Sequence, residues 1–162
     1  MADSSFDVVS DFDQQELVNA LDQVRREVAT RYDFKGAQVS MELGKSEITL
    51  QADDEYRASA VKDLIQSKAV RRNLSLKIFD WGKLEPAAGG TVRQHIGLKR
   101  GLTADQAKEL SKIIRETFPK VKPTIQGDAV RVSGKSRDEL QAVIAHLKGL
   151  DYPVALQFEN YR

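Results

Sequence analysis

The sequence predicts an α+β protein made of two tandem ferredoxin-like units, each with the order β-α-β-β-α-β and an antiparallel sheet. Alternating strand patterns and helical apolar repeats follow one another in that order twice along the 162 residues. A segment with the composition of a linker, GKLEPAAGG (82–90), separates the two copies. The copies also match in sequence, because ITLQADDEYRASAVKDLI from Ile48 aligns with VRVSGKSRDELQAVIAHL from Val130.

The first copy opens with SFDVVS (5–10), whose alternation of apolar and polar residues is typical of a half-buried strand. Asp13 then caps a helix, and Glu16 stands three residues later, as a capping box requires. Apolar residues at helical spacing follow. A hairpin around Gly44, a second helix and the strand LSLKIFDW complete the copy.

The second copy repeats this order. TVRQHIGLK is its opening strand, and Thr103 with Gln106 forms a capping box before the next helix. A hairpin around Gly127, a helix capped by Ser136 and the strand VALQFENY follow. Because both helices of such a unit cover one face of its sheet, the other face is left for solvent, a partner domain or a ligand.

Composition narrows the classes of function. The chain has no cysteine, which excludes disulfides, thiolate zinc sites and cysteine nucleophiles. The acidic N-terminal segment lacks the apolar stretch of a secretory signal, and no run approaches the roughly 18 apolar residues that span a membrane. We therefore expect a cytoplasmic protein that does not associate with a membrane.

Charge is distributed unevenly, although the net charge is only +1. Residues 1–35 hold eight acidic and four basic side chains, whereas residues 93–122 hold eight basic and three acidic ones. A basic segment can attract phosphate-bearing ligands. It is also typical of a solvated helix face, and charge alone favours that interpretation.

The sequence contains no evident catalytic or metal-binding constellation. His95 and His146 fall in different elements, and neither stands near a Ser/Asp pattern or at metal-ligand spacing. SGKS (133–136) resembles part of a phosphate loop, but Ala129 stands where the first glycine of G-x-x-x-x-G-K-[ST] is required. Either Lys135 holds one phosphate at the start of the next helix, or the segment is a plain helix cap. We expect no enzymatic activity, no metal and no cofactor.

Two four-stranded sheets in tandem are also found in RNA-recognition domains, which stack bases on aromatic residues of their central strands. The corresponding strands in this sequence, EITLQA and AVRVSG, contain no aromatic residue. A standard RNA-recognition domain is therefore disfavoured.

Basic and aromatic residues occur together in three segments that each border a strand. Arginine pairs bidentately with phosphate and stacks on bases, and aromatic rings also stack on bases. The segments could converge on one cleft, or each could be a solvated basic edge with its aromatic residues in the core. With Lys135, they supply the candidate nucleotide-binding residues: Arg31, Tyr32, Phe34 and Lys35 in RYDFKG, Arg71 and Arg72 in AVRRNLSLK, and Arg93, His95, Lys99 and Arg100 in RQHIGLKRG.

RYDFKG (31–36) carries the strongest signal of the three. It lies between a helix and a hairpin, in extra length that the second copy lacks. Residues present in only one copy are not needed to close the fold, and function often lies on such connections. We expect Arg31 and Lys35 to contact phosphate and Tyr32 or Phe34 to offer a stacking face. The structural alternative places Phe34 in the core.

Four segments, SFDVVSDFD, ATRYDFKG, IQGDAVRVSGKSRDELQ and LQFENYR, resemble in the same order the YajQ family of bacterial nucleotide-binding proteins. The resemblance covers nearly the whole chain. It implies two ferredoxin-like domains that exchange their first strands, so that strand 6–9 joins the C-terminal sheet and TVRQHIGLK joins the N-terminal one. The implied domains are 11–98, with strand 91–98 added after the linker, and 1–10 together with 99–162.

The resemblance also implies a function. Members of the family are described as binding nucleotides and RNA, some act as cyclic-di-GMP effectors, and no enzymatic activity is assigned to them. We therefore expect a regulatory nucleotide-binding protein whose ligand is cyclic di-GMP, GTP or ATP, with tRNA or another RNA and a regulatory protein as further partners. The alternatives are a protein-interaction module that uses its open sheet face, and a nucleoside triphosphatase that uses the SGKS turn.

Overall fold

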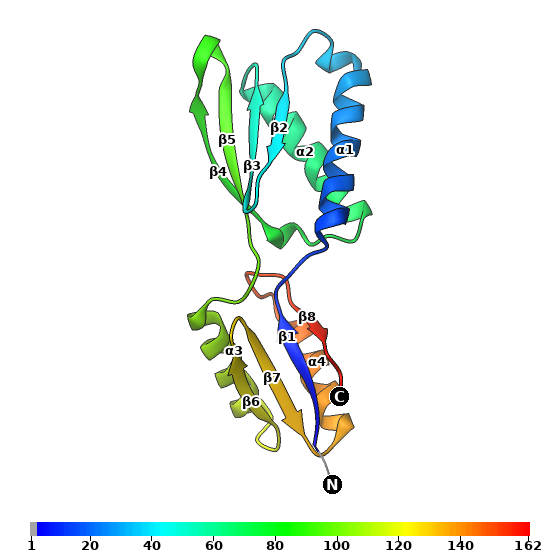
Figure 1. Ribbon diagram of the computed structural model, residues 1–162, viewed down its shortest axis with the longest axis vertical. Helices are drawn as coiled ribbons and strands as arrows, with labels where there is room; N and C mark the ends of the chain where they lie inside the picture. The colour runs from blue at the N-terminus through cyan, green and yellow to red at the C-terminus, as the bar shows by residue number, and fades with distance from the viewer. Residues whose placement is uncertain (1–2) are drawn as a thin grey trace. The chain divides into compact units, whose positions relative to one another are not determined.

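The computed structural model describes residues 3–162 and divides into two compact units (Figure 1). Unit 1 extends to Asp11 and resumes over Arg100–Arg162, and unit 2 is Phe12–Lys99. The chain therefore passes from one unit to the other twice, after Asp11 and after Lys99.

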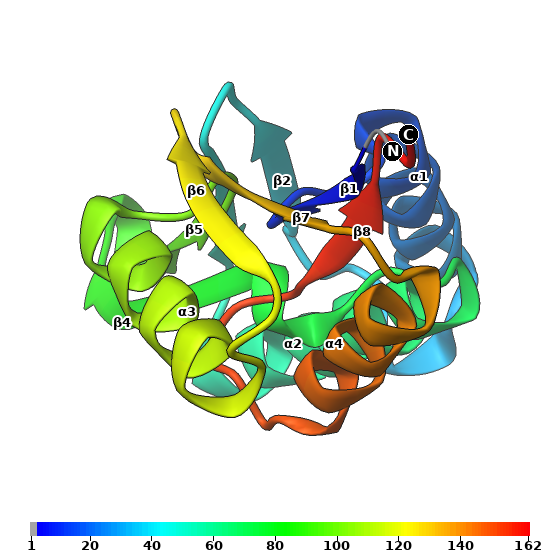
Figure 2. The same ribbon diagram turned by 90° about the horizontal axis from the view of Figure 1, so that it is seen from below.

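Unit 1 is a four-stranded antiparallel sheet with two helices on one face (Figure 2). The order of its strands is β6-β7-β1-β8, so β1 lies in the middle, between β7 and β8. Its elements are β1 (Ser4–Val9), α3 (Ala104–Thr117), β6 (Lys122–Gln126), β7 (Ala129–Gly134), α4 (Arg137–Gly149) and β8 (Gln157–Glu159).

Unit 2 has the same architecture, with the strand order β2-β3-β5-β4. The late strand β5 occupies the central position that β1 has in unit 1, because it pairs with β3 and β4. Its elements are α1 (Gln14–Thr30), the 3₁₀ turn η1 (Tyr32–Phe34), β2 (Ser40–Leu43), β3 (Glu47–Ala52), α2 (Glu55–Arg71), the 3₁₀ turn η2 (Leu76–Ile78), β4 (Phe79–Pro86), the 3₁₀ turn η3 (Ala88–Gly90) and β5 (Val92–Leu98).

The predicted fold class is confirmed, including the exchange of the two opening strands. The strand β1 precedes unit 2 in sequence, yet its Phe6 and Val8 are fully buried in the core of unit 1. In the same way, β5 supplies the fully buried Ile96 to unit 2. Periodicity predicted the strands. The apolar side chains of β1 and β5 pack in the cores of the units whose sheets these strands complete.

The prediction of a linker at 82–90 is wrong. Residues up to Pro86 belong to β4, and η3 lies in the connection from β4 to β5. The strand β4 lies at the edge of the sheet, and the pairing shifts register between Trp81 and Leu84. Most of its residues are exposed, so this edge strand has the composition of a linker. Proline is tolerated in an edge strand, which explains Pro86.

The predicted N-terminal helix caps are present in both units. The carboxylate of Asp13 accepts hydrogen bonds from the backbone N–H groups of Gln15 and Glu16. Thr103 and Gln106 form the predicted capping box, in which each side chain bonds the backbone N–H of the other. Such caps satisfy N–H groups that have no partner within the helix.

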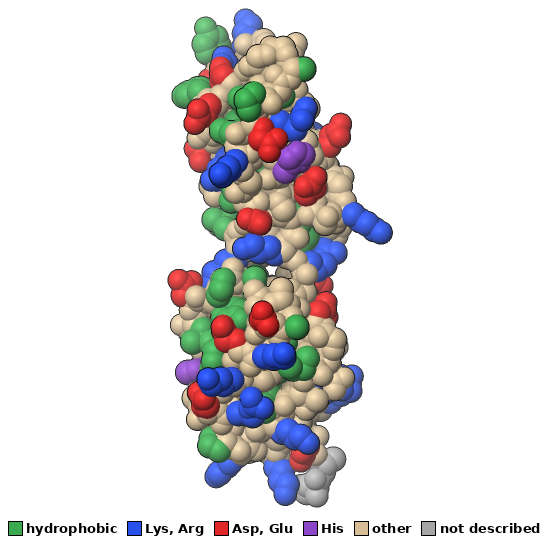
Figure 3. All heavy atoms as spheres, turned by 90° about the vertical axis from the view of Figure 1, so that its left-hand side faces the viewer, with side chains coloured by type: hydrophobic (Ala, Val, Ile, Leu, Met, Phe, Trp, Pro, Cys, Tyr) green, Lys and Arg blue, Asp and Glu red, His purple; other side chains and the backbone are tan. Residues whose placement is uncertain are grey.

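The basic segment 93–122 is divided between the two units at Lys99. Its first seven residues belong to unit 2 and the rest to unit 1, so the segment is not one continuous surface element. On the face drawn in Figure 3, Lys and Arg side chains are interspersed with Asp and Glu. This pattern is typical of a solvated surface.

An ion pair between a buried carboxylate and a half-buried arginine lies on the sheet of unit 1. Asp7 in β1 is only 6% exposed, and its Oδ1 accepts a hydrogen bond of 3.0 Å from Nε of Arg131 in β7. Asn160 donates from Nδ2 to Oδ2 of the same carboxylate at 2.9 Å. The hydrogen bond from Arg131 is the main reason that the pKa of Asp7 lies below its usual value.

Phe6→Ala should destabilise unit 1, although Phe6 precedes the whole of unit 2 in the sequence. Removing a buried phenyl ring costs about 3–5 kcal/mol. Native-state hydrogen exchange should therefore accelerate for amides of β7 and α4 and stay unchanged in β3 and α2. Ile96→Ala is the matched control and should give the reverse pattern. Faster exchange confined to β3 and α2 in Phe6→Ala would contradict the strand exchange.

Asp7→Asn should remove a pH-dependent part of the stability. Because the pKa of Asp7 is lowered by folding, its ion pair stabilises the protein above the ordinary carboxyl pKa, and this stabilisation is lost as the pH falls through the lowered value. The difference in unfolding free energy between wild type and Asp7→Asn should be largest near neutrality and shrink below about pH 4. Urea titrations across this pH range measure the difference, and one that grows on acidification would contradict the assignment.

Candidate functional site

RYDFKG forms the junction between α1 and the chain that leads to β2. The helix α1 ends at Thr30, with the backbone N–H of Arg31 still bonded to the carbonyl of Glu27. The 3₁₀ turn η1 follows, and Gly36 then adopts a φ of 77°. Only glycine adopts this left-handed conformation without strain, so the glycine of the motif is needed for the turn itself.

The guanidinium of Arg31 is held in one orientation by two neighbours. Its Nε and Nη2 donate to the two carboxylate oxygens of Asp33, at 3.0 and 2.7 Å. Its central carbon lies 5.4 Å from the centroid of the Phe34 ring. The hydrogen bond with Asp33 raises the pKa of Arg31, and the arginine side chain is still 39% exposed. The guanidinium is therefore a fixed, charged plane that solvent can reach.

A hollow of about 250 Å³ opens beside this guanidinium. Tyr56 lines it from the first turn of α2 and is 71% exposed, and Tyr32 in η1 is 89% exposed. Bases stack both on aromatic rings and on guanidinium planes. The complete lining consists of Arg31, Asp33, Tyr56, Ser59, Ala60 and Asp63.

The inclusion of Phe34 among the predicted nucleotide-binding residues is wrong. Its ring is 3% exposed and is part of the core of unit 2, so it offers no face to a ligand. The structural alternative for this residue is the correct one. The pattern of RYDFKG could not decide between the two aromatic residues, because a 3₁₀ turn has no alternation that assigns each side chain to core or solvent.

Arg31 and Lys35 differ in what they can still bind. Two donors of Arg31 are already occupied by Asp33, and this weakens its predicted role as a phosphate ligand. Lys35 is exposed, and its ammonium makes no ion pair with any residue from 3 to 162. Arg31 is thus suited to stacking and Lys35 to contact with an anion.

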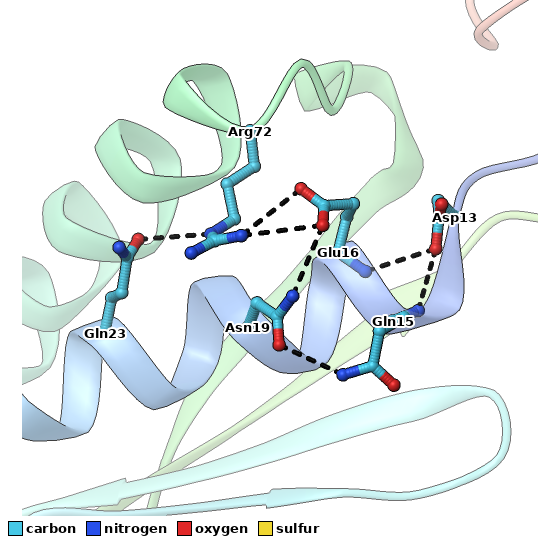
Figure 4. Close-up of polar contacts among 6 residues, drawn as sticks. All are labelled: Asp13, Gln15, Glu16, Asn19, Gln23 and Arg72. Atoms are coloured by element: carbon cyan, nitrogen blue, oxygen red, sulfur yellow. Dashed lines mark hydrogen bonds and ion pairs between the residues drawn. The ribbon is translucent and has the colours of Figure 1, made fainter.

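Arg71 and Arg72 lie at the C-terminal end of α2, and Arg72 is engaged in a contact between helices (Figure 4). Its Nε donates to Oε1 of Gln23 at 3.3 Å, and its Nη1 lies 3.4 Å from Oε2 of Glu16. Glu16 therefore faces Arg72, and its carboxylate does not complete the predicted capping box with Asp13. Arg72 fastens α2 to α1, whereas Arg71 is exposed.

Arg93 and His95 lie on the face of the unit 2 sheet that the helices leave open. They alternate along β5 with the buried Gln94 and Ile96, which face the helices. Nδ1 of His95 lies 3.4 Å from a carboxylate oxygen of Glu47 in β3. The sheet separates this face from the helix layer that contains the hollow at Arg31. The three basic-aromatic segments therefore do not converge on one cleft.

Three predicted cations lie outside this region of unit 2. Lys99 is the last residue of unit 2, and Arg100, the first of the second segment of unit 1, pairs with Asp11 at 2.8 Å. Lys135 is exposed in the turn before α4. At the end of β7, just before this turn, a Cβ on Gly134 would lie 3.2 Å from Cγ1 of Val121. A side chain at this position would press on Val121, so packing favours a small residue here whether or not a phosphate binds.

Tyr56, Ser59 and Asp63 line the hollow at Arg31 and were not predicted from the sequence. A signal for Tyr56 was present, because it is an aromatic residue out of phase with the apolar repeat of Val61 and Ile65 in α2. Ser59 and Asp63 are ordinary residues of an exposed helix face, and only the proximity of η1 to α2 brings them to a hollow.

Hollows also occur elsewhere in the described part of the chain. One, of about 310 Å³, lies at one end of the unit 2 sheet and is lined by Gln38, Val39, Ser40, Gln51 and Thr91. Another, of about 250 Å³, lies in unit 1 between α4, the start of β1 and the end of the chain.

Within residues 3–162, no group of three or more His, Asp or Glu side chains is placed to hold a metal ion, and no helix is long and apolar enough to cross a membrane.

Comparison with known proteins decides the relationship. Residues 4–162 match the family described as nucleotide-binding protein YajQ-like. The chain belongs to this family. A protein of Chloroflexus aurantiacus named nucleotide-binding protein is 59% identical, over 99% of each chain. Proteins of the same name from Trichormus variabilis and Synechococcus elongatus are each 58% identical, over 98% of this chain and 97% and 98% of theirs. The family suggested by the four quoted segments is thereby confirmed.

Phe34→Ala and Tyr32→Ala should differ sharply in their effect on stability. Phe34→Ala should lower the free energy of unfolding by about 3–5 kcal/mol, because it empties a buried site. Tyr32→Ala should change that free energy by less than about 0.5 kcal/mol, because its ring is in solvent. Urea denaturation measures both, and equal losses would contradict the placement of the two rings.

Proposed function

We propose that this chain binds a nucleotide, without catalysing a reaction, in the hollow beside the turn from Arg31 to Lys35. The main support is the guanidinium of Arg31. Asp33 and Phe34 fix its orientation beside a hollow that Tyr56 also lines. Relatives that are 58–59% identical carry the name nucleotide-binding protein, which favours the same class of ligand.

The base is assigned to the hollow. Its ring stacks on the exposed face of Arg31, and Tyr56 or Tyr32 provides a second aromatic contact. Stacking of a base on a side chain contributes about 1–3 kcal/mol. The hydroxyl of Ser59 and the carboxylate of Asp63 can accept hydrogen bonds from N–H groups at the edge of the base.

The phosphate is assigned to the other end of the turn. Asp33 and Asp63 both line the hollow, so the local charge disfavours a phosphate there. Lys35 offers an ammonium without an ion pair. The phosphate therefore points out of the hollow toward Lys35, which orients the ligand.

The ligands proposed for this site are cyclic di-GMP, GTP and ATP, and a short RNA is the polymeric alternative. A binder without catalytic groups acts through what it contacts, so the proposal includes a regulatory role with a protein or RNA partner. Ligands of this kind occur inside the cell, which places the proposed activity in the cytoplasm. A nucleoside triphosphatase at the SGKS turn is disfavoured, because Ala129 stands where a phosphate loop needs its first glycine.

Calorimetric titration with cyclic di-GMP, GTP, ATP and a short RNA tests the proposal. Arg31→Ala should weaken binding at least tenfold, about 1.4 kcal/mol, whereas the protein should stay folded, because the Arg31–Asp33 pair is exposed to solvent and contributes little to stability. Arg31→Lys should not restore the affinity, because lysine keeps the charge but has no plane for stacking. Arg93→Ala, on the opposite face of the sheet, is the matched control.

The outcomes separate the alternatives. Unchanged affinity in a folded Arg31→Ala protein would remove this hollow from the site, and a larger loss in Arg93→Ala would move the site to the open sheet face. Full rescue by Arg31→Lys would show that Arg31 acts as a simple charge. Measurements at two salt concentrations identify the ligand class, since RNA binding through many phosphates weakens steeply with salt.

A further inference from the structure

We propose that unit 1 carries a second ligand site, a slot between Tyr161 and α4 that takes a flat ring with an anionic group, as in a nucleoside monophosphate. The slot is the hollow of about 250 Å³ in unit 1, and it does not depend on the site at Arg31. Its lining comes from the start of β1, one face of α4 and the end of the chain: Ser4, Ser5, Phe6, Arg137, Leu140, Gln141, Ile144, Tyr161 and Arg162.

The floor of the slot is apolar and rigid. Phe6, Leu140 and Ile144 line it, and all three are buried members of the unit 1 core. Ligand sites are typically apolar hollows with a few placed polar groups. Ser4, Ser5 and Gln141 supply such groups at the rim.

One wall of the slot is the ring of Tyr161, which is 61% exposed and lies 6.2 Å from Phe6 between ring centroids. Strict alternation from Phe158 would direct Tyr161 to the other face of the sheet. Asn160 prevents this, because its φ of 57° interrupts the strand, and both aromatic residues then contact Phe6.

The backbone on both sides of Tyr161 is fixed. The N–H of Arg162 donates to the carbonyl of Ser5 at 2.9 Å, and the N–H of Ser5 donates back at 3.2 Å. Asn160 is held by its bond to Asp7. Asparagine adopts the left-handed conformation more readily than most residues with a side chain, so Asn160 suits this position. Here it holds an aromatic ring opposite a helix, with space between them.

The rim of the slot carries positive charge. Arg137, the first residue of α4, is exposed, and its guanidinium makes no ion pair or hydrogen bond with any residue that the structure describes. Arg162 also lines the slot. The acidic residues of the first turn of α4, Asp138 and Glu139, are not part of the lining. A cation at a helix N-terminus is unfavourable for the helix dipole, so stability does not explain Arg137 there.

These features together define the class of ligand. A flat ring fits between Tyr161 and the aliphatic side chains of Leu140 and Ile144, where stacking and apolar burial act on opposite faces. A phosphate on that ring's sugar would pair with Arg137 at the rim, because guanidinium binds phosphate bidentately. The volume lies below the roughly 300–1,000 Å³ of sites for drug-sized ligands, so the slot takes one nucleobase and not a dinucleotide.

Titration of the full chain with AMP and with GMP, followed by ¹H–¹⁵N spectra, tests the slot. The amides of Ser5, Arg137 and Gln141 should shift on titration. Tyr161→Ala and Arg137→Ala should each weaken this response at least tenfold, whereas Tyr161→Phe should keep it, because the ring and not the hydroxyl makes the contact. Tyr161 is largely exposed, so its variants are expected to fold.

Two controls make the result unambiguous. Lys135→Ala removes a neighbouring cation that does not line the slot and should leave AMP binding unchanged. Arg31→Ala disables only the site proposed in unit 2, so the unit 1 shifts should persist in it whether or not that site exists. Absence of shifts at Ser5 and Gln141, or equal binding by wild type and Tyr161→Ala, would overturn the slot. A loss in Lys135→Ala that matches the loss in Arg137→Ala would reduce it to a non-specific basic surface.

Discussion

The rest of the structure depends on how β1 and β5 pair within the two sheets, each as an inner strand. In unit 1, β1 lies between β7 and β8 and pairs with residues at least 122 positions later in the chain, as for Val8 and Val130. It supplies Phe6 to the core, Asp7 to the ion pair with Arg131 and Ser5 to the backbone pairing with Arg162. Phe6 and Ser5 line the hollow beside Tyr161, and Asp7 bonds the side chain of Asn160, which precedes Tyr161. In unit 2, β5 has the same position, and the sheet that it completes supports α1 and α2.

Both proposed sites hold a flat group in place and leave part of it exposed. In unit 2, Asp33 and Phe34 hold the guanidinium of Arg31, while in unit 1 the backbone pairing at Arg162 and the contact with Phe6 hold Tyr161. A group that is already ordered loses little conformational entropy when a ligand stacks on it, which favours binding. The repeated architecture supplies the scaffold twice, and the two sites use different side chains on it.

The sequence predicted the elements and caps well, because periodicity and capping are local properties. It could not show which sheet β1 joins, since an alternating strand fits either, and that part came from the family resemblance. The exposed edge strand that ends at Pro86 was predicted as a linker, because its composition resembles that of a linker. Composition drew attention to the turn at Arg31 but could not show that Phe34 is buried. It also gave no reason to single out Tyr56 or Tyr161. Whether such rings are exposed depends on contacts between distant elements.

Stacking of a base on Arg31 is tested most directly by the Nε–H resonance of that arginine in ¹H–¹⁵N spectra of the full chain titrated with cyclic di-GMP or GTP. The hydrogen bond to Asp33 fixes this N–H and should make it observable. If a base stacks on the guanidinium, this resonance should shift by the ring current of the base, together with the amides of Tyr56 and Ser59. Shifts confined to Arg93 and His95, with Arg31 unchanged at saturating ligand, would contradict the proposed site.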